Sequence, residues 1–102
     1  MKRFDIEYAL QTKNHLRSID RKHWSLIRET IKQQLSFEPD VRTKNRKPMQ
    51  RSSFFSWEIR FGSKNQFRAY YDINHEQWMV NVQAIGVKIR EKVYIAGKEI
   101  QL

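Results

Sequence analysis

The stretch that decides the fold is WEIRFGSKNQFRAYYDINHEQWMVNVQAIGVKI, residues 57–89. Along it and just before it, apolar and polar side chains alternate in three runs, which is the pattern of strands with one buried face. The alternating runs cover residues 55–61, 67–73 and 78–84. The segments between them, Gly62–Asn65 and Asn74–Gln77, have the composition of short turns. Three successive strands joined by short turns predict an antiparallel meander.

The first forty residues show a different periodicity. Residues 4–8 alternate as a short strand does, and Leu16 with Ile19 indicates a short helix. A longer helix follows, with an N-cap at Asp20 and an end before Pro39. Its apolar residues recur at helical spacing: Trp24, Ile27, Ile31 and Leu35. We therefore expect a single α+β domain over residues 1–102, with two N-terminal helices packed on a small antiparallel sheet.

Two segments lie outside these elements. Residues 40–53 form a connecting loop, which is long for a compact domain. Within residues 42–51 of this loop, five cations occur and no acid: Arg42, Lys44, Arg46, Lys47 and Arg51. Such a run is typical of a solvated loop or of a polyanion contact, so we expect it outside the core. Near the C-terminus, residues 93–100 predict a small hairpin or an edge strand around Gly97.

The composition limits the classes of function. Twenty Lys and Arg face eleven Asp and Glu, and the net charge of +9 predicts a nucleic-acid or acidic-protein partner. The chain has no cysteine, which excludes disulfides, thiolate zinc sites and a cysteine nucleophile. No apolar run approaches the roughly 20 residues of a membrane span, and acids interrupt the N-terminal segment where a signal peptide would be apolar. We expect a cytoplasmic protein without a membrane partner.

The alternation predicts which side chains share the open face of the sheet, because residues i and i+2 point the same way. If Trp57, Ile59 and Phe61 face the helices, then Glu58 and Arg60 face the open side. By the same reasoning the face collects cations and an aromatic ring, with Tyr94 nearby: Arg60, Arg68, Tyr70, Lys88 and Arg90. Cations bind phosphates and aromatic rings stack on bases, so this face is a possible RNA site. An ordinary solvated sheet face would show a similar pattern.

Other kinds of site have little support in the sequence. His15, His23 and His75 lack metal-ligand spacing, and we expect surface or packing roles for them. Asp72 and Glu76 flank a turn and are more typical of turn formers than of an acid–base pair. The chain contains no P-loop, no glycine-rich dinucleotide fingerprint and no serine elbow. We therefore expect neither a metal nor a cofactor.

Five short segments, taken in order, resemble the RelE/ParE superfamily of bacterial toxins, and most closely its branch with an Asn-Arg-Lys-Pro signature. They are Thr43-Lys-Asn-Arg-Lys-Pro-Met49, Trp57-Glu-Ile-Arg-Phe-Gly62, Phe67-Arg-Ala-Tyr-Tyr-Asp72, Ala84-Ile-Gly-Val-Lys88 and Tyr94-Ile-Ala-Gly97. The resemblance implies a microbial RNase-like fold and the toxin of a type II toxin–antitoxin pair. It further implies metal-independent, ribosome-dependent cleavage of mRNA and neutralisation by a cognate acidic antitoxin.

The resemblance also implies roles for single residues. Arg60 matches a basic position on the strand after the loop, and Arg68 matches the arginine that helps to bind and stabilise the scissile phosphate. Tyr94 matches a late tyrosine that stacks on a base or assists proton transfer. Lys88 stands where RelE usually has arginine, and it completes the implied catalytic set. Arg46, Lys47, Tyr70 and Arg90 are the expected RNA-binding residues. Glu58 departs from the pattern, because RelE has a lysine there and a carboxylate repels phosphate.

Two other functions remain open at this point. A ParE-like inhibitor of DNA gyrase would use the same fold without RNA chemistry, and Glu58 and Lys88 favour it. A catalytically inert module that binds RNA or an antitoxin would have the same charge. The sequence does not locate the antitoxin surface, which could be the early helices or an edge of the sheet.

Overall fold

Helices come early in the chain and most strands come late, in a computed structural model that describes residues 2–50 and 54–101. The elements are β1 (Asp5–Tyr8), α1 (Thr12–Arg17), α2 (Trp24–Leu35), β2 (Arg46–Pro48), β3 (Trp57–Phe61), β4 (Phe67–Asn74), β5 (Met79–Ile89), β6 (Lys92–Ile95) and β7 (Lys98–Ile100). Two short 3₁₀ turns are η1 (Arg21–His23) and η2 (Ser63–Asn65). The α+β class and the early helices are confirmed.

The strands form one seven-stranded sheet in the order β2-β3-β4-β5-β6-β7, and these neighbours run antiparallel. The long strand β5 has two partners on one edge. Its first half pairs with β1, and its last residues pair with β6. The β1–β5 pairing is parallel, which differs from the purely antiparallel sheet that we expected. Strand β1 precedes the helices, and the chain returns to the position beside it only with β5, after β3 and β4. Strand β5 runs there in the same direction as β1.

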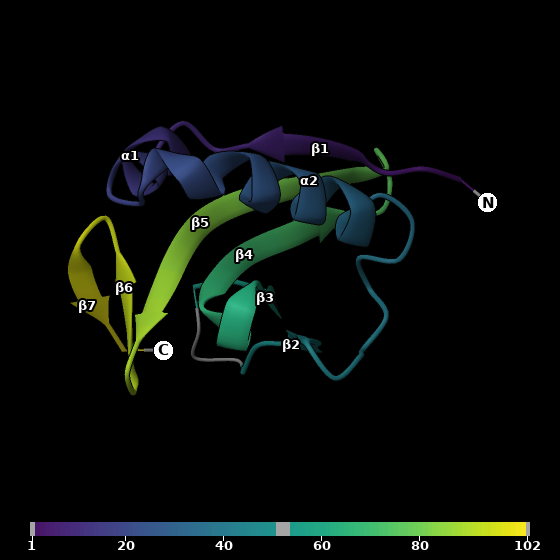
Figure 1. Cartoon of the computed structure of the whole chain (residues 1–102). Coiled ribbons are helices and arrows are strands. Elements are labelled where there is room, and N and C mark those ends of the chain that lie inside the picture. Colours follow the sequence, from purple (N-terminus) through teal and green to yellow (C-terminus); the bar gives the residue numbers. More distant parts are fainter. Residues whose placement is uncertain (1, 51–53, 102) are drawn as a thin grey trace.

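Helix α2 lies across one face of the sheet, over β4 and β5 (Figure 1). Its residues Ile27, Ile31 and Leu35 are fully buried and join the core with the inward residues of the strands. The predicted cap is confirmed, since the Asp20 carboxylate accepts a hydrogen bond from the Lys22 backbone N–H at 3.0 Å. It caps η1, the turn that leads into α2. No helix in the described part of the chain is long and apolar enough to cross a membrane.

A buried histidine connects α1 to the sheet. The Ile85 N–H on β5 donates to Nδ1 of His15 at 3.2 Å. Burial lowers the pKa of His15, which favours the neutral ring that can accept this bond. The packing role expected for His15 is confirmed.

The basic run of residues 42–51 does not lie wholly outside the core, which corrects our expectation. Arg46 is 4% exposed and begins β2. Its guanidinium donates to the Val41 carbonyl at 2.9 Å and to the backbone and side-chain oxygens of Gln34 at 3.0 Å each. Carbonyls at the end of a helix lack partners within it, and Arg46 supplies donors to one of those of α2. Arg51, at the end of the run, is outside the described residues.

Candidate functional site

Cations from four strands, β2 to β5, share the sheet face that α2 leaves open. Cross-strand neighbours project to the same face, and Arg60 on β3 pairs with Arg68 on β4. Glu58 pairs with Tyr70 on one side and with Lys47 of β2 on the other. In β5, Gly86 stands opposite Arg68. A side chain on Gly86 would place its Cβ 3.1 Å from the Tyr94 carbonyl oxygen, so the backbone of β6 approaches β5 closely at this position.

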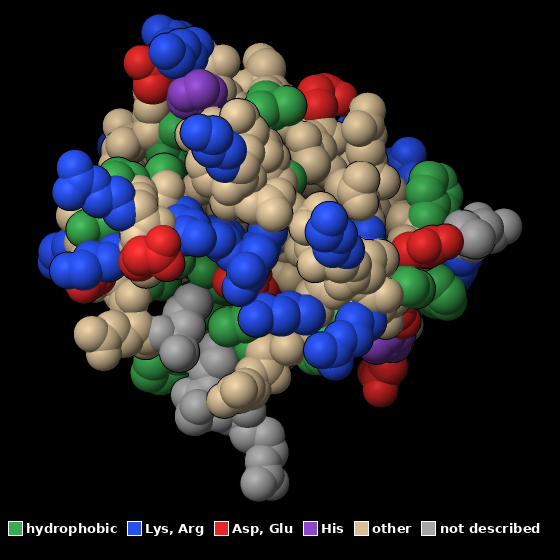
Figure 2. Space-filling view, turned by 60° about the horizontal axis from the view of Figure 1, so that its bottom comes forward, with side chains coloured by type: hydrophobic (Ala, Val, Ile, Leu, Met, Phe, Trp, Pro, Cys, Tyr) green, Lys and Arg blue, Asp and Glu red, His purple; other side chains and the backbone are tan. Residues whose placement is uncertain are grey.

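These side chains line a cavity of about 380 Å³, here called the cationic cavity. Its lining residues are Lys47, Pro48, Met49, Gln50, Glu58, Arg60, Arg68, Lys88, Glu91 and Val93. Four of these residues are cations and two are carboxylates, so the net charge of the lining is +2. Figure 2 shows the side of the molecule that includes β2 and β3, where Lys and Arg side chains clearly outnumber Asp and Glu. The field in such a hollow attracts anions.

Glu58 sits at the base of this charge cluster and is 3% exposed. One of its oxygens lies 2.8 Å from Arg60 Nε, 3.9 Å from Arg68 Nη1 and 4.0 Å from Lys47 Nζ. We expected this carboxylate to repel an RNA phosphate. Its geometry shows instead that it gathers three cations, which together more than neutralise it, so the cavity as a whole still attracts anions.

Arg68 is the buried cation of the cluster, with 3% exposure. Its Nε is buried and has no hydrogen-bond partner among the described residues. Burial lowers the pKa of Arg68, and the nearby charge of Arg60 lowers it further, while Glu58 acts in the opposite direction. The Nε of Arg46 and the hydroxyl of Tyr70 are buried without such a partner as well, so this feature is not specific to the cavity. Arg68 contributes to the site through its charge, because it is one of the cations that line the cationic cavity.

Tyr70 reaches the open face as predicted, but it is fully buried there. The ring of Phe55 stacks against it, with 5.1 Å between ring centroids. Burial raises the pKa of Tyr70, and the Glu58 carboxylate raises it further. A covered ring cannot stack on a base, so the RNA-binding role expected for Tyr70 is corrected to packing beneath the cluster.

Tyr94 and Arg90 do not join the cluster, and this also corrects an expectation. Tyr94 pairs with Val87, which pairs with Phe67 of the core, so Tyr94 belongs to the face that carries the helices. There it lines a separate hollow with His23. Arg90 is exposed in the β5–β6 turn, with a φ of 59°. The structure therefore brings together four of the eight expected residues: Lys47, Arg60, Arg68 and Lys88.

Glu58 is the functional residue whose role sequence reasoning missed. Alternation places Glu58 on the same face of β3 as Arg60, but it does not show which cations of the neighbouring strands reach the carboxylate. A carboxylate with cations on both neighbouring strands is an organising charge, but cross-strand pairing is not visible in a sequence.

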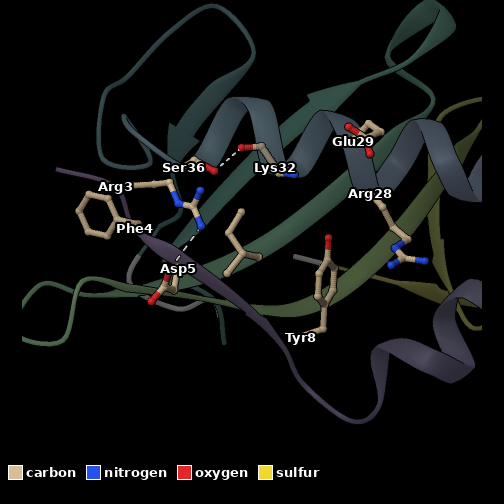
Figure 3. A pocket seen from close by; sticks show the side chains of 9 residues that line it. Arg3, Phe4, Asp5, Tyr8, Arg28, Glu29, Lys32 and Ser36 are labelled. Atoms are coloured by element: carbon tan, nitrogen blue, oxygen red, sulfur yellow. Dashed lines mark hydrogen bonds and ion pairs between the residues drawn. The ribbon is translucent and has the colours of Figure 1, made fainter. Parts of the chain in front are cut away.

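A second surface lies at the edge of the sheet, between β1 and α2 (Figure 3). Two adjoining hollows of about 320 and 400 Å³ share Tyr8 and Arg28, and we call them together the β1–α2 groove. Figure 3 shows Tyr8 standing between the strand and the helix, with Arg28 beside it. The floor contains apolar side chains such as Leu16 and Trp24. The lining has five cations and two carboxylates: Arg3, Lys13, Arg17, Arg28 and Lys32, with Asp5 and Glu29.

Comparisons with protein-family models, with curated proteins and with solved structures found no match to this chain. Within the described ranges, no group of three or more histidine or carboxylate side chains is placed to hold a metal ion. The function is therefore inferred from the geometry of the cationic cavity.

Replacing Glu58 with Gln should lower the free energy of unfolding by about 3 kcal/mol, because the buried Arg68 loses its counter-charge. Inorganic phosphate should restore part of this loss in Glu58→Gln and stabilise the wild type less, since a bound anion replaces the missing charge. Urea denaturation with and without phosphate measures both effects.

The control variant is Glu91→Gln, which changes an exposed carboxylate of the same cavity. Its stability should stay within about 0.5 kcal/mol of the wild type. A Glu58→Gln protein as stable as the wild type would contradict the organising role of Glu58.

Proposed function

We propose that the protein is the toxin of a type II toxin–antitoxin pair, with a RelE-like, microbial RNase-like fold, acting in the cytoplasm as a metal-independent endoribonuclease on ribosome-bound mRNA. The observation that carries the proposal is the cationic cavity on the open face of the sheet, whose lining includes Arg60, Arg68 and Lys88 and has a net charge of +2. Arginine binds phosphate through its planar fork of donors, and RNA presents one phosphate per nucleotide. The order of the short motifs along the chain supports the same function.

The residues of the cavity account for cleavage at one phosphate. The RNA 2′-oxygen attacks the adjacent phosphorus, the bond from phosphorus to the 5′-oxygen breaks, and the products are a 2′,3′-cyclic phosphate and a free 5′-hydroxyl. Arg60 and Arg68 stabilise the extra negative charge of the transition state. Glu58 accepts the proton of the 2′-hydroxyl, and Lys88 donates one to the departing 5′-oxygen. These two roles replace the one that the sequence suggested for Tyr94.

The geometry of the cavity supports the proposed dependence on the ribosome. Cleavage requires the 2′-oxygen, the phosphorus and the 5′-oxygen to lie in line. Proteins that orient single-stranded RNA alone use exposed aromatic rings as stacking platforms. Tyr70 is covered by Phe55, so the cavity binds a phosphate without offering that ring to a base. The ribosome would hold the mRNA in the orientation that this protein does not impose.

The β1–α2 groove is the surface that we propose for the acidic antitoxin. Its apolar floor accepts apolar side chains of a partner segment, and its excess of cations attracts the acidic ones. Strand β1 forms one wall and pairs only with β5 among the described strands, so its other edge can take an added strand.

Inducible expression in a bacterial host should stop incorporation of a labelled amino acid while labelled thymidine incorporation continues. Arg68→Ala and Arg68→Lys should remove the effect, the second because an ammonium lacks the fork of donors. Arg90→Gln, an exposed cation outside the cavity, should remain toxic. Folding of each variant is checked by urea denaturation.

A folded Arg68→Ala protein that is still toxic would contradict the role proposed for Arg68 in the cationic cavity. Blocked thymidine incorporation would point to the gyrase inhibitor, and no arrest of growth would point to an inert module.

Co-expression of the neighbouring reading frame should rescue growth if it encodes the antitoxin. The double variant Arg17→Glu/Arg28→Glu should stay toxic and resist rescue by at least tenfold in antitoxin dose, because the groove now repels acidic side chains. Arg42→Glu, an exposed position outside the groove, should be rescued as the wild type is. Full rescue of the double variant would show that the antitoxin binds elsewhere.

A further inference from the structure

The hydroxyl group of Tyr70 is buried on the same side of the sheet as the cationic cavity. Tyr70 lies two residues after Arg68 on β4, so the two side chains project to one face, and Glu58 is its cross-strand neighbour on β3. The hydroxyl has no hydrogen-bond partner among the described residues. The guanidinium of Arg46 also has an unpaired Nε, but its other two nitrogens donate hydrogen bonds. The Tyr70 side chain has no second polar atom that could do the same.

A buried hydroxyl without a partner is unfavourable, and phenylalanine would fill the same space without that cost. Burial and the charge of Glu58 both raise the pKa of Tyr70, so the phenol keeps its proton and remains a donor. The Phe55 ring stacks on Tyr70, with 5.1 Å between ring centroids, and restricts its movement. A protonated donor is therefore held beside the Glu58 carboxylate.

The Glu58 carboxylate contacts its three cations through one oxygen. Oε1 lies 2.8 Å from Arg60 Nε, and it lies 3.9 and 4.0 Å from Arg68 Nη1 and Lys47 Nζ. The two longer distances exceed that of a hydrogen bond, so Arg68 and Lys47 are held there by charge alone and can turn to a second anion. All three contacts involve Oε1, which leaves Oε2 to accept a hydrogen bond from another donor.

A phosphate in the cationic cavity competes with Glu58 for these cations. Arginine forms paired hydrogen bonds with phosphate, which are stronger than a charge contact at 3.9 Å. As the cations turn to the phosphate, Glu58 loses part of its charge compensation, although it is only 3% exposed. A buried carboxylate then needs another donor. The Tyr70 hydroxyl is an unpaired donor on the neighbouring strand.

We propose that Tyr70 is a positioning residue, whose hydroxyl donates to Glu58 when an anion takes over the cations of the cavity. This inference rests on the proposed function, in which Glu58 accepts the proton of the RNA 2′-hydroxyl while Arg60 and Arg68 bind the phosphate. The carboxylate can do so only if a group other than those cations holds it in place. The hydroxyl is unpaired in the free protein and paired in the anion complex, so it contributes to binding rather than to the stability of the free protein.

The test compares the wild type with Tyr70→Phe and uses inorganic phosphate as the probe. In urea denaturation without phosphate, Tyr70→Phe should unfold at the same urea concentration as the wild type or at a higher one, because the lost hydroxyl had no partner. In isothermal titration calorimetry, its affinity for phosphate should be about tenfold lower, a difference of about 1.4 kcal/mol. Tyr94→Phe, the same change on the other face of the sheet, is the matched control and should bind phosphate as the wild type does.

A second comparison shows whether Tyr70 acts through Glu58. In the Glu58→Gln background, adding Tyr70→Phe should weaken phosphate binding by less than about threefold, because a neutral amide needs the donor less than a carboxylate does. In wild-type protein labelled with ¹³C at Cζ of tyrosine, saturation with phosphate should shift the Tyr70 signal, which is identified by its absence from Tyr70→Phe. The signals of Tyr8, Tyr71 and Tyr94 should stay unchanged.

Loss of stability in Tyr70→Phe without phosphate would overturn the inference, because the hydroxyl would already be paired in the free protein. Unchanged phosphate affinity in Tyr70→Phe would overturn it as well and would leave the phosphate site intact. The full loss of affinity, if it persists in the Glu58→Gln background, would show that Tyr70 contacts the phosphate directly, which contradicts a positioning role. If the wild type binds no phosphate, the site of the proposed function and this inference both fall.

Discussion

The buried carboxylate of Glu58 is the constraint on which the charged face depends. Arg68 is 3% exposed, and a guanidinium at that depth needs a counter-charge. Glu58 provides it and simultaneously holds Arg60 at 2.8 Å and Lys47 at 4.0 Å. One carboxylate thereby brings cations from β2, β3 and β4 to a single cavity. It cannot neutralise all of them, and the remaining positive charge is available to a ligand.

Packing on both faces of the sheet supports this arrangement. On the helix side, α2 and the buried residues of the strands make the core that fixes β3, β4 and β5 relative to one another. On the open side, Phe55 covers Tyr70 beneath the cluster. Arg46 connects the loop before β2 to the end of α2 through three hydrogen bonds. That connection helps to place Lys47 beside Glu58.

The fold was largely predictable, whereas the site was predictable in part. Alternation and helical spacing located the meander and α2, because both periodicities follow from burying one face. The same alternation placed Arg60 and Arg68 together. It did not place Tyr94, since the β5–β6 turn, where Arg90 has a φ of 59°, sets the register of the last hairpin. The burial of Arg46 could not be predicted from the sequence either. A cation in a basic run is expected to be solvated, and the carbonyl groups that it contacts are known only from the structure.

Sequencing the ends of mRNA on purified translating ribosomes, incubated with the purified protein, tests the central claim most directly. The account predicts new breaks within the message on the ribosome, with a 5′-hydroxyl on one side and a 2′,3′-cyclic phosphate on the other. These breaks should persist when the divalent ions that only contaminating nucleases need are removed from the reaction. Intact mRNA at a protein concentration that arrests growth would contradict the account, and so would breaks that end in a 5′-phosphate.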